Sequence, residues 1–397
     1  MTMMAVLDEG RTAGALAAQP ARIAQIEIAR DIESAAAAWL ELQNGDVFAT
    51  PYQRYEFLGA WQRNVGAQHG VTPYIVIARD SEYRPLMLMP LGVARGHGAR
   101  VASYLGGKHC TFNMPLWRSD AARAIDAAEL EVLIAALRAQ PDCPDVLALC
   151  QQPSSWWELS NPMALLPHQP SVNQCPVLVM QPGAPATDRV SNSFRRRLKA
   201  KEKKYQALPG YRYSRITEDS EIDAVLAAFF RIKPVRMKAQ GLPDVFAEPG
   251  VEAFVREACH ARVGGGRAID IHALICDDEM IAMFAGVADQ SRYSMMFNTY
   301  TLSENSRYSP GLILMRHIID HYADQGYTRL DLGIGSDDYK KMFCKELDPI
   351  FDSYLPLTPR GRIHAAVMAA TARAKRVIKH NPALMQIAQR LRSAMRR

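Results

Sequence analysis

The chain has 397 residues, 48% of them hydrophobic, which is enough for two or three domains with substantial cores. No stretch approaches the roughly 18 uninterrupted apolar residues of a membrane-spanning helix, and Asp8, Glu9 and Arg11 interrupt the region where a signal peptide would be apolar. The seven cysteines include no CxxC pair, so we expect reduced thiols in a cytoplasmic protein and no metal site.

The net charge of +6 is unevenly distributed. Residues 194–205 contain seven Lys or Arg against one Glu, and residues 359–397 contain ten Lys or Arg and no acid. The remainder of the chain is therefore acidic. Such basic segments contact nucleic acid, anionic lipid or an acidic partner, and for residues 194–205 a solvated helix face is an equal alternative.

The first half alternates helical and strand patterns after residues 1–24, which we expect to be a mobile leader. Helical patterns cover 31–42, 51–65 and 121–139, and strand patterns cover 74–78, 86–93, 101–105, 146–150 and 177–180. Trp156 and Trp157 lie in a Pro-rich loop, where they either stack on a sugar or pack into a seam between domains, with packing favoured.

The second half repeats this order loosely. Helical patterns cover 193–208, 222–233 and 251–262, and strand patterns cover 211–216, 269–276, 280–288 and 293–300. Acidic turns at 80–82 and 277–279 occupy corresponding places in the two halves. We therefore expect two copies of one α/β unit, each a mixed sheet covered by helices.

One stretch near the end of the second half predicts a helix, a short buried strand and a glycine turn. Ser309 is a plausible N-cap, Pro310 takes the first helical position, and Gly326 ends the apolar helical pattern. The first turn of such a helix can bind a phosphate through its free N–H groups. The alternative is an ordinary helix–turn–strand unit of an α/β core.

Several short motifs in this order resemble a known family. They are Ser-Phe-Arg-Arg-Arg-Leu at 193–198, Tyr-Ser-Pro-Gly-Leu at 308–312, Asp-Leu-Gly at 331–333 with Tyr-Lys at 339–340 and Phe343, and in the first half Leu-Gly-Gly at 105–107 with Phe-Asn at 112–113. Together they resemble the bacterial CelD-type acyltransferases, which are named for cellulose and exopolysaccharide biosynthesis. That family belongs to the GNAT superfamily of N-acetyltransferases and is close to the Fem peptidyl transferases.

The resemblance covers roughly residues 25–358 and implies tandem GNAT-like domains with mixed α/β sheets. It places a first domain at 25–185, a second domain with the acyl-donor site at 186–358, and a basic amphipathic helical tail at 359–397. It implies acyl-CoA, such as acetyl-CoA, as donor, or aminoacyl-tRNA for the Fem branch, with the acceptor entering a cleft between the halves. The acceptor is then an amine or a hydroxyl, for example of a polysaccharide or its lipid-linked precursor.

The residues predicted to bind the acyl donor lie at or just before the first turn of the helix that begins at Pro310. They are Arg307, Tyr308, Ser309, Gly311 and Leu312. The usual pyrophosphate loop of acetyltransferases reads Arg/Gln-x-x-Gly-x-Gly/Ala, and here residues 305–311 keep the helix start and one glycine. Phosphate binding would then depend on first-turn N–H groups and Arg307, with no contribution from the Pro310 nitrogen.

The chemistry of acyl transfer suggests three candidate catalytic residues. Asp331 is the candidate base, Tyr339 a donor to a thiolate or carbonyl, and Lys340 a cation for phosphate or an acidic acceptor. Each has a structural alternative: a polar strand end, a packed ring and a solvated lysine. His272 alternates with apolar neighbours and is expected to be a satisfied core histidine rather than a cleft residue.

The basic tail has an apolar stripe of its own. Its members are Ile363, Val367, Ala370, Ala374, Val377 and Ile378. Such a helix either contacts the anionic inner membrane peripherally or docks on the acidic body or a second subunit. Two other functional hypotheses stay open. One is a non-catalytic scaffold, and the other is a tRNA-dependent transferase that uses the basic segment 195–204 as an RNA contact.

Overall fold

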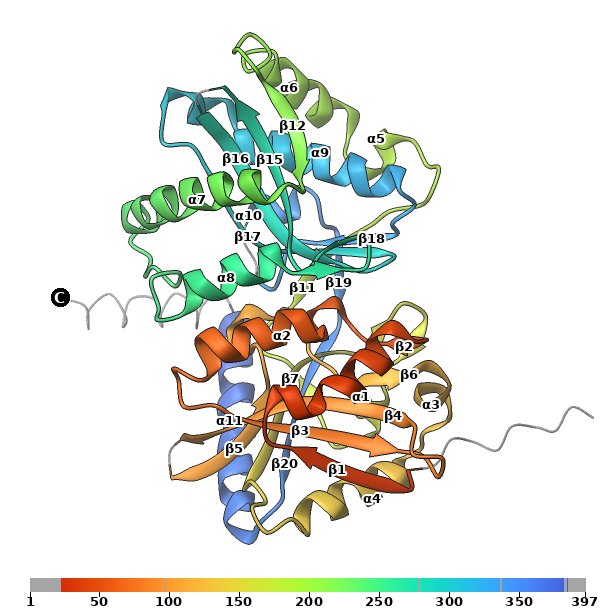
Figure 1. The fold of residues 1–397 in the computed structure, drawn as a ribbon. Coiled ribbons are helices and arrows are strands. Elements are labelled where there is room, and N and C mark those ends of the chain that lie inside the picture. The colour runs from red at the N-terminus through yellow and green to blue at the C-terminus, as the bar shows by residue number, and fades with distance from the viewer. Residues whose placement is uncertain (1–22, 97, 278, 336–337, 382–383, 385–397) are drawn as a thin grey trace, which may run out of the picture.

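The computed structural model describes residues 23–96, 98–277, 279–335, 338–381 and 384, and it contains two sheets, one in each half of the molecule (Figure 1). The expected leader lies outside these residues except for positions 23 and 24, and so does most of the tail beyond 381. None of the helices in the described part of the chain is long and apolar enough to cross a bilayer.

The first sheet is built mainly from antiparallel neighbours, with one parallel pair between β5 and β7. Its order is β1 (Gln25–Ala29), β3 (Thr72–Arg79), β4 (Pro85–Gly96), β5 (Ala99–Tyr104), β7 (Val146–Pro153), β20 (Ile350–Pro356) and β10 (Gln169–Pro170), with β6 (Leu116–Arg118) on β4 and β2 (Val47–Phe48) on β6. The predicted hairpin 74–93 is confirmed, and its turn at Asp80 is held by that carboxylate, which accepts from the N–H groups of Glu82 and Arg84.

The second sheet places its only parallel pair, β17 with β18, beside a set of antiparallel hairpins. Its order is β12 (Arg212–Ile216), β15 (Asp270–Cys276), β16 (Glu279–Ala288), β17 (Arg292–Tyr300), β18 (Arg329–Asp331), β11 (Cys175–Val179) and β19 (Glu346–Asp348). The three consecutive strands predicted over 269–300 are confirmed. Small hairpins lie outside both sheets, at β8 (Ser155–Trp156) with β9 (Leu159–Ser160) and β13 (Arg262–Val263) with β14 (Gly266–Arg267).

The two halves exchange strands. β11 comes from the first half of the chain but lies between β18 and β19 of the second sheet. β20 comes from the end of the second half but lies between β7 and β10 of the first sheet. The boundaries expected at residues 185 and 358 therefore do not separate the sheets, because backbone pairing joins segments that are distant in sequence.

Helices cover both sheets, and their bounds differ from the sequence patterns where a cap residue intervenes. The α-helices are α1 (Ile32–Asn44), α2 (Tyr55–Trp61), α3 (Ser119–Ala124), α4 (Ala127–Arg138), α5 (Ala186–Arg189), α6 (Asn192–Glu202), α7 (Asp219–Ala239), α8 (Val251–His260), α9 (Pro310–Asp324), α10 (Asp338–Lys341) and α11 (Pro359–His380). The single helix expected over 121–139 is two helices, because Ile125 and Asp126 are extended and Asp126 caps α4 by accepting from the N–H of Glu129. The helix expected over 51–65 is interrupted at Arg54, whose ψ is 142°.

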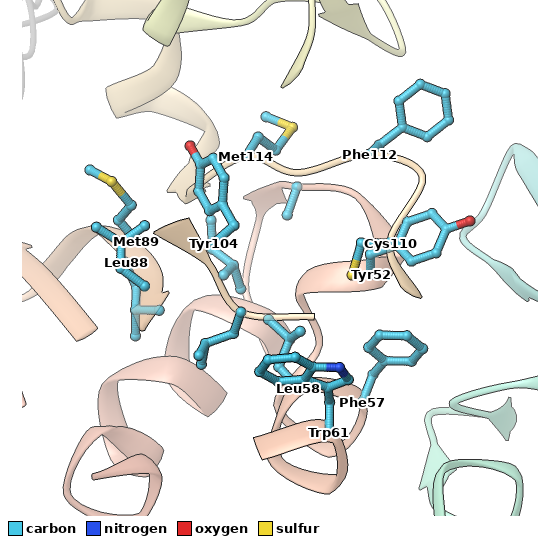
Figure 2. Close-up of a cluster of buried hydrophobic side chains, with 14 of the residues drawn as sticks. Tyr52, Phe57, Leu58, Trp61, Leu88, Met89, Tyr104, Cys110, Phe112 and Met114 are labelled. Carbon is cyan, nitrogen blue, oxygen red and sulfur yellow. The ribbon is translucent and has the colours of Figure 1, made fainter. Parts of the chain in front are cut away.

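The core of the first half gathers aromatic and sulfur-containing side chains from α2, β4, β5 and the segment 110–114 (Figure 2). Both faces of the second sheet are buried. Successive side chains of β16 point to opposite faces, so this strand contributes to the core on each side. Met283, Ala285 and Val287 join the cluster that includes α7 and α8, whereas Ala282 and Phe284 join the cluster around α9. The first of these clusters continues into the first half, so one apolar core spans the seam.

Candidate functional site

Helix α9 begins where the sequence predicts, but its cap differs from the expected one. Ser309 occupies the N-cap position with φ 61° and ψ 52°, and its side chain makes no capping hydrogen bond. A left-handed backbone at a residue other than glycine is uncommon and tends to occur at functional sites. The Ser309 Oγ instead accepts a hydrogen bond of 2.8 Å from the Lys201 Nζ of the basic helix α6. Helix α6 is thereby held against the start of α9.

The first turn of α9 offers fewer free amide groups than a standard helix start. Pro310 has no N–H, and the amides of Leu312 and Ile313 donate to the Ser309 carbonyl at 3.1 and 3.2 Å. Among the described backbone hydrogen bonds, the Gly311 amide is the first-turn donor that remains for a ligand. Anion binding at this end therefore requires help from cationic side chains.

A groove extends from the start of α9 to the seam between the halves, and we call it the α9 groove. It consists of two adjoining cavities of about 630 and 410 Å³ that share Lys233, Met237, Asn298 and Tyr339 as lining residues. The larger cavity lies at the α9 start, and the smaller one is lined partly by residues 108–111 of the first half. No Asp or Glu occurs among the described residues that line either cavity.

One edge of β17 has no partner among the described strands where it lies inside the α9 groove. β17 and β18 are paired only from Arg292 to Ser294 and from Arg329 to Asp331, and β17 then continues alone on this side to Tyr300. Residues 295–298 and Tyr300 line the groove. Such an edge presents backbone N–H and C=O groups that an extended amide-containing ligand can pair with.

Two cationic side chains from α7 enter the groove. The Lys233 Nζ donates to the Asn298 carbonyl at 2.9 Å, and burial together with the neighbouring Arg236 charge lowers the pKa of Lys233. The Arg236 guanidinium lies 3.3 Å from the ring centre of Tyr300. Both groups favour an anionic ligand, because none of the described residues that line the groove is acidic.

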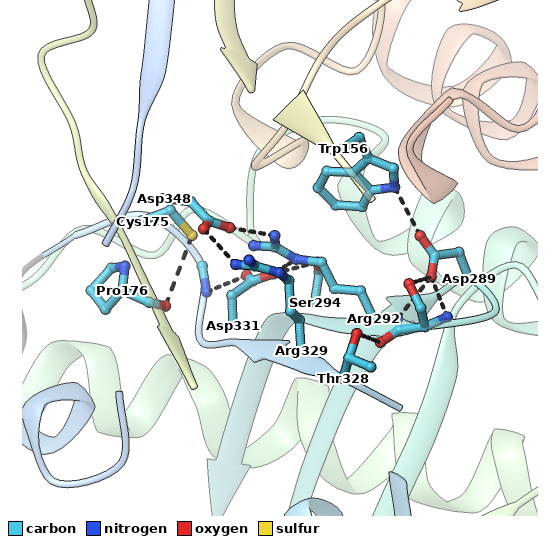
Figure 3. Close-up of polar contacts among 12 residues, drawn as sticks. Trp156, Cys175, Pro176, Asp289, Arg292, Ser294, Thr328, Arg329, Asp331 and Asp348 are labelled. Atoms are coloured by element: carbon cyan, nitrogen blue, oxygen red, sulfur yellow. Dashed lines mark hydrogen bonds and ion pairs between the residues drawn. The ribbon is translucent and has the colours of Figure 1, made fainter. Parts of the chain in front are cut away.

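Asp331, the predicted base, lies in a buried ion-pair network instead of in the groove (Figure 3). Its Oδ2 accepts from Arg292 Nε at 2.8 Å and from the Ser294 hydroxyl, and its Oδ1 accepts from the Gly333 amide at 3.0 Å. The side chain is 0% exposed. A general base needs an oxygen within reach of the acceptor's proton, so this geometry gives Asp331 a structural role at the point where β17 and β18 separate.

Lys340 is a buried residue rather than a solvated one. Its Nζ donates to the Gly333 carbonyl at 3.1 Å and to the Ile334 carbonyl at 2.8 Å. The ammonium group thus holds the glycine turn that follows β18, where Gly333 has φ 73°. Lys340 lines the smaller cavity, but its charge is directed at protein carbonyls, which leaves less of it for a phosphate.

The remaining predicted residues divide between groove and surface. Ser309, Gly311 and Leu312 line the larger cavity, and the half-buried Tyr339 lines both cavities. Arg307 and Tyr308 are not among the lining residues. Arg307 is exposed, pairs with Glu304 at 3.5 Å and lies over the Tyr308 ring, which in turn packs on Tyr205. Chain proximity to Ser309 alone does not bring these two side chains into the site.

His109 lines the groove from the first half, and no sequence pattern predicted it. Trp61 Nε1 donates to its Nδ1 at 3.0 Å, so the neutral ring carries its proton on Nε2. Burial, reinforced by the Lys108 charge, lowers the pKa of His109 to about 4. A neutral imidazole with one N–H can donate to a carbonyl oxygen in the cavity.

The lowered pKa of His109 predicts a pH-dependent stability. The pKa of histidine in the unfolded chain is near 6.5. The full stability of the folded state is therefore present above that pH, and it decreases as the pH falls from 6.5 towards 4. On acidification, we expect the free energy of unfolding of His109→Phe to fall by about 3 kcal/mol less than that of the wild-type protein. Denaturant unfolding of both proteins at pH 7.5 and pH 4.5 measures the difference. Equal pH dependence in the two proteins would contradict the assignment.

His272 and the two tryptophans have the packing roles that the sequence favours. His272 is fully buried, with Nδ1 3.0 Å from the Tyr213 hydroxyl and Nε2 3.0 Å from the Tyr322 hydroxyl, so it is a satisfied core histidine. Trp156 and Trp157 both direct Nε1 to the Asp289 carboxylate, at 2.9 and 3.2 Å. These bonds join a first-half hairpin to the β16–β17 turn. Trp156 and Trp157 also line a separate cavity of about 820 Å³.

The sequence of the second half matches a known domain family. Residues 192–341 match the family model of the GNAT acetyltransferase domain. The similarity to a GNAT acetyltransferase domain therefore concerns the second half of the chain. This range includes α6 and every described residue of the second half that lines the α9 groove, among them Tyr339. A GNAT domain indicates an acyltransferase-type enzyme. A search of curated proteins finds no match to the chain.

Solved structures extend the similarity to both halves. FemX superimposes with a TM-score of 0.55 at 7% identity, over 86% of this chain and 100% of that one. A conserved protein of unknown function from Bacteroides thetaiotaomicron superimposes with a TM-score of 0.51 at 11% identity, over 83% of this chain and 100% of that one. At such identities the similarity concerns the fold alone. The expected mixed α/β class with GNAT-like folds is confirmed, and the described part of the expected basic tail forms a helix over Pro359–His380.

Proposed function

We propose that this protein transfers an acyl group from acyl-CoA to an amine or hydroxyl acceptor, with the donor bound in the α9 groove. The observation that carries the proposal is the unpaired edge of β17, which runs through the groove from the α9 start to the seam. Following the CelD-type resemblance, the proposed acceptor is a saccharide of the cell envelope or its precursor.

The parts of acyl-CoA correspond in order to the parts of the groove. The pyrophosphate lies by the Gly311 amide and Arg236, where the helix start and a guanidinium supply positive charge. The pantetheine arm has two amide groups, which pair with the free edge of β17 as an added strand would. The thioester then lies in the smaller cavity near Tyr339, and the acceptor enters from residues 108–111.

The chemistry uses the few polar groups of the smaller cavity. A neutral acceptor amine or a hydroxyl attacks the thioester carbonyl, forming the new C–N or C–O bond, and the C–S bond then breaks. The His109 Nε2–H stabilises the developing oxyanion. Tyr339 donates its proton to the departing thiolate and regains one from the water that receives the acceptor's proton. The products are acylated acceptor and free CoA.

Loss of Arg236 tests donor binding. We expect Arg236→Ala to raise the Kd for acetyl-CoA about tenfold, because one charge-assisted contact to phosphate is lost. Isothermal titration calorimetry measures the change. Arg231→Ala is the matched control, since Arg231 is an exposed arginine of the same helix that does not line the groove. If wild-type protein binds neither CoA, acetyl-CoA nor longer acyl-CoAs, the proposal fails and the scaffold hypothesis gains support.

The charge of α6 supports a second candidate, transfer from aminoacyl-tRNA. The exposed side chains of this helix and its end include Arg196, Arg197, Lys199, Lys203 and Lys204. Lys201 of the same helix contacts Ser309 at the mouth of the groove, so a bound polyanion would reach the site. Two observations together would support this candidate: the protein binds tRNA with an affinity that falls steeply as the salt concentration rises, and it does not bind acyl-CoA.

A further inference from the structure

Helix α11 docks on the first half by a face of small residues. Its N-terminus is capped by Thr358, and the helix packs on the neighbouring strands β20, β7 and β5 (Figure 1) with Gly361, Ala365 and Ala372 buried. The fit is close, because a Cβ at Gly361 would lie 1.8 Å from the Asp145 carbonyl oxygen. Gln169 Nε2 also donates to the Ala369 carbonyl. The helix is therefore a fixed part of the first half.

The apolar stripe of α11 faces outward. Ile363 is 70% exposed, Val367 and Val377 are each 59% exposed, and Ile378 is 37% exposed. At about 100° per residue these positions, with Ala370 and Ala374, lie opposite the small-residue docking face. The helix docks on the body, which is one of the alternatives expected from the sequence, but it does so through its small-residue face and not through this stripe. We call these outward residues the α11 stripe.

Basic side chains border the α11 stripe on both sides. Arg362 and Arg373 lie along one flank and Lys375 along the other, and all three are exposed. Residues 359–397 contain no acid. Arg360 lies near Asp145 at the helix start, so the strongest positive field belongs to the middle and end of the helix.

We propose that the α11 stripe binds the surface of an anionic lipid bilayer, with the helix lying parallel to the membrane plane. An amphipathic helix with aliphatic residues between cationic flanks buries its apolar side chains at the headgroup boundary while its charges meet lipid phosphates. A second copy fits less well, because a twofold contact would bring the arginine flanks of two identical helices together. The proposal is independent of the reaction in the α9 groove.

Vesicle co-sedimentation of the full chain tests this proposal. We expect wild-type protein to bind vesicles of phosphatidylcholine with 30% phosphatidylglycerol at least tenfold more tightly than vesicles of pure phosphatidylcholine, and to be released by high salt. We expect Val367→Ser/Val377→Ser to weaken binding to the anionic vesicles at least tenfold. Both valines are exposed, so the fold should persist, and circular dichroism checks this.

The matched control is Val132→Ser/Val235→Ser, which changes two exposed valines of α4 and α7 and should bind as wild type does. Equal binding to both kinds of vesicle, or unchanged binding by the α11 double variant, would overturn the proposal. A dimer in sedimentation equilibrium that the α11 double variant dissociates would assign the stripe to a second copy instead. Because the variant leaves residues 382–397 unchanged, a contribution of that basic segment alone would appear as retained binding.

Discussion

Replacing Arg292 by methionine is expected to lower the free energy of unfolding by about 3–5 kcal/mol. The guanidinium is 4% exposed and pairs with two carboxylates, Asp331 through Nε at 2.8 Å and Asp348 through Nη1. Burial alone would lower the pKa of Arg292, but the two carboxylates reverse this and raise it. Methionine would leave the buried Asp331 without its counter-charge, which costs more than the pair itself contributes.

The same arginine also joins the halves. Its guanidinium carbon lies 4.5 Å from the ring centre of Phe112 and 4.6 Å from that of Trp156, both from the first half. Urea unfolding of wild type and variant measures the loss. Arg329→Met is the control, since Arg329 pairs with the same Asp348 from a partly exposed position and should cost less than about 1 kcal/mol. Equal losses in the two variants would show that the buried pair has no special role.

Replacing Tyr339 by phenylalanine is expected to lower turnover about 100-fold while the Kd for the acyl donor changes less than twofold. The residue lies where the two cavities of the α9 groove meet, which is where the thioester would be held. Phenylalanine keeps the ring but removes the hydroxyl that we propose as the proton donor to the thiolate. A loss confined to turnover is the signature of an interaction made in the transition state.

Tyr308→Phe provides the control for this experiment. Tyr308 is a neighbouring tyrosine that does not line the groove and packs instead against Tyr205. Turnover and donor affinity should both stay near wild-type values in that variant. If Tyr339→Phe turns over normally, proton delivery to the thiolate belongs to another group, and Lys233 is then the next residue to change, because its pKa is already lowered.

Local pattern predicted most strands and the start of α9, because alternation and turn residues act over a few positions. It did not predict the partners of Asp331. The alternation rule placed its side chain opposite Leu330 and Leu332, but the rule contains nothing about Arg292, whose position 39 residues earlier decides what Asp331 does. The sequence does not predict a place in the groove for His109, since its surroundings depend on Trp61 and on a cavity whose other wall comes from the second half.

The α11 stripe shows what a helical pattern leaves open. The spacing of its apolar residues predicts a helix, and α11 is a helix over Pro359–His380. Pattern alone cannot distinguish an apolar face that packs inward from one that faces outward. The small residues Gly361, Ala365 and Ala372 decided the matter, because they allow a closer approach to the sheet than valine or isoleucine.

The exchange of β11 and β20 has a consequence for synthesis of the chain on the ribosome. The first sheet obtains β20 only after residue 350 has been made, so until then the edge of β7 that β20 later occupies has no partner strand. Domains normally complete folding one after another as the chain emerges. Because β20 follows the described strands of the second sheet in the chain, the first half can reach its final state only after those strands have been made, and the two halves therefore mature together.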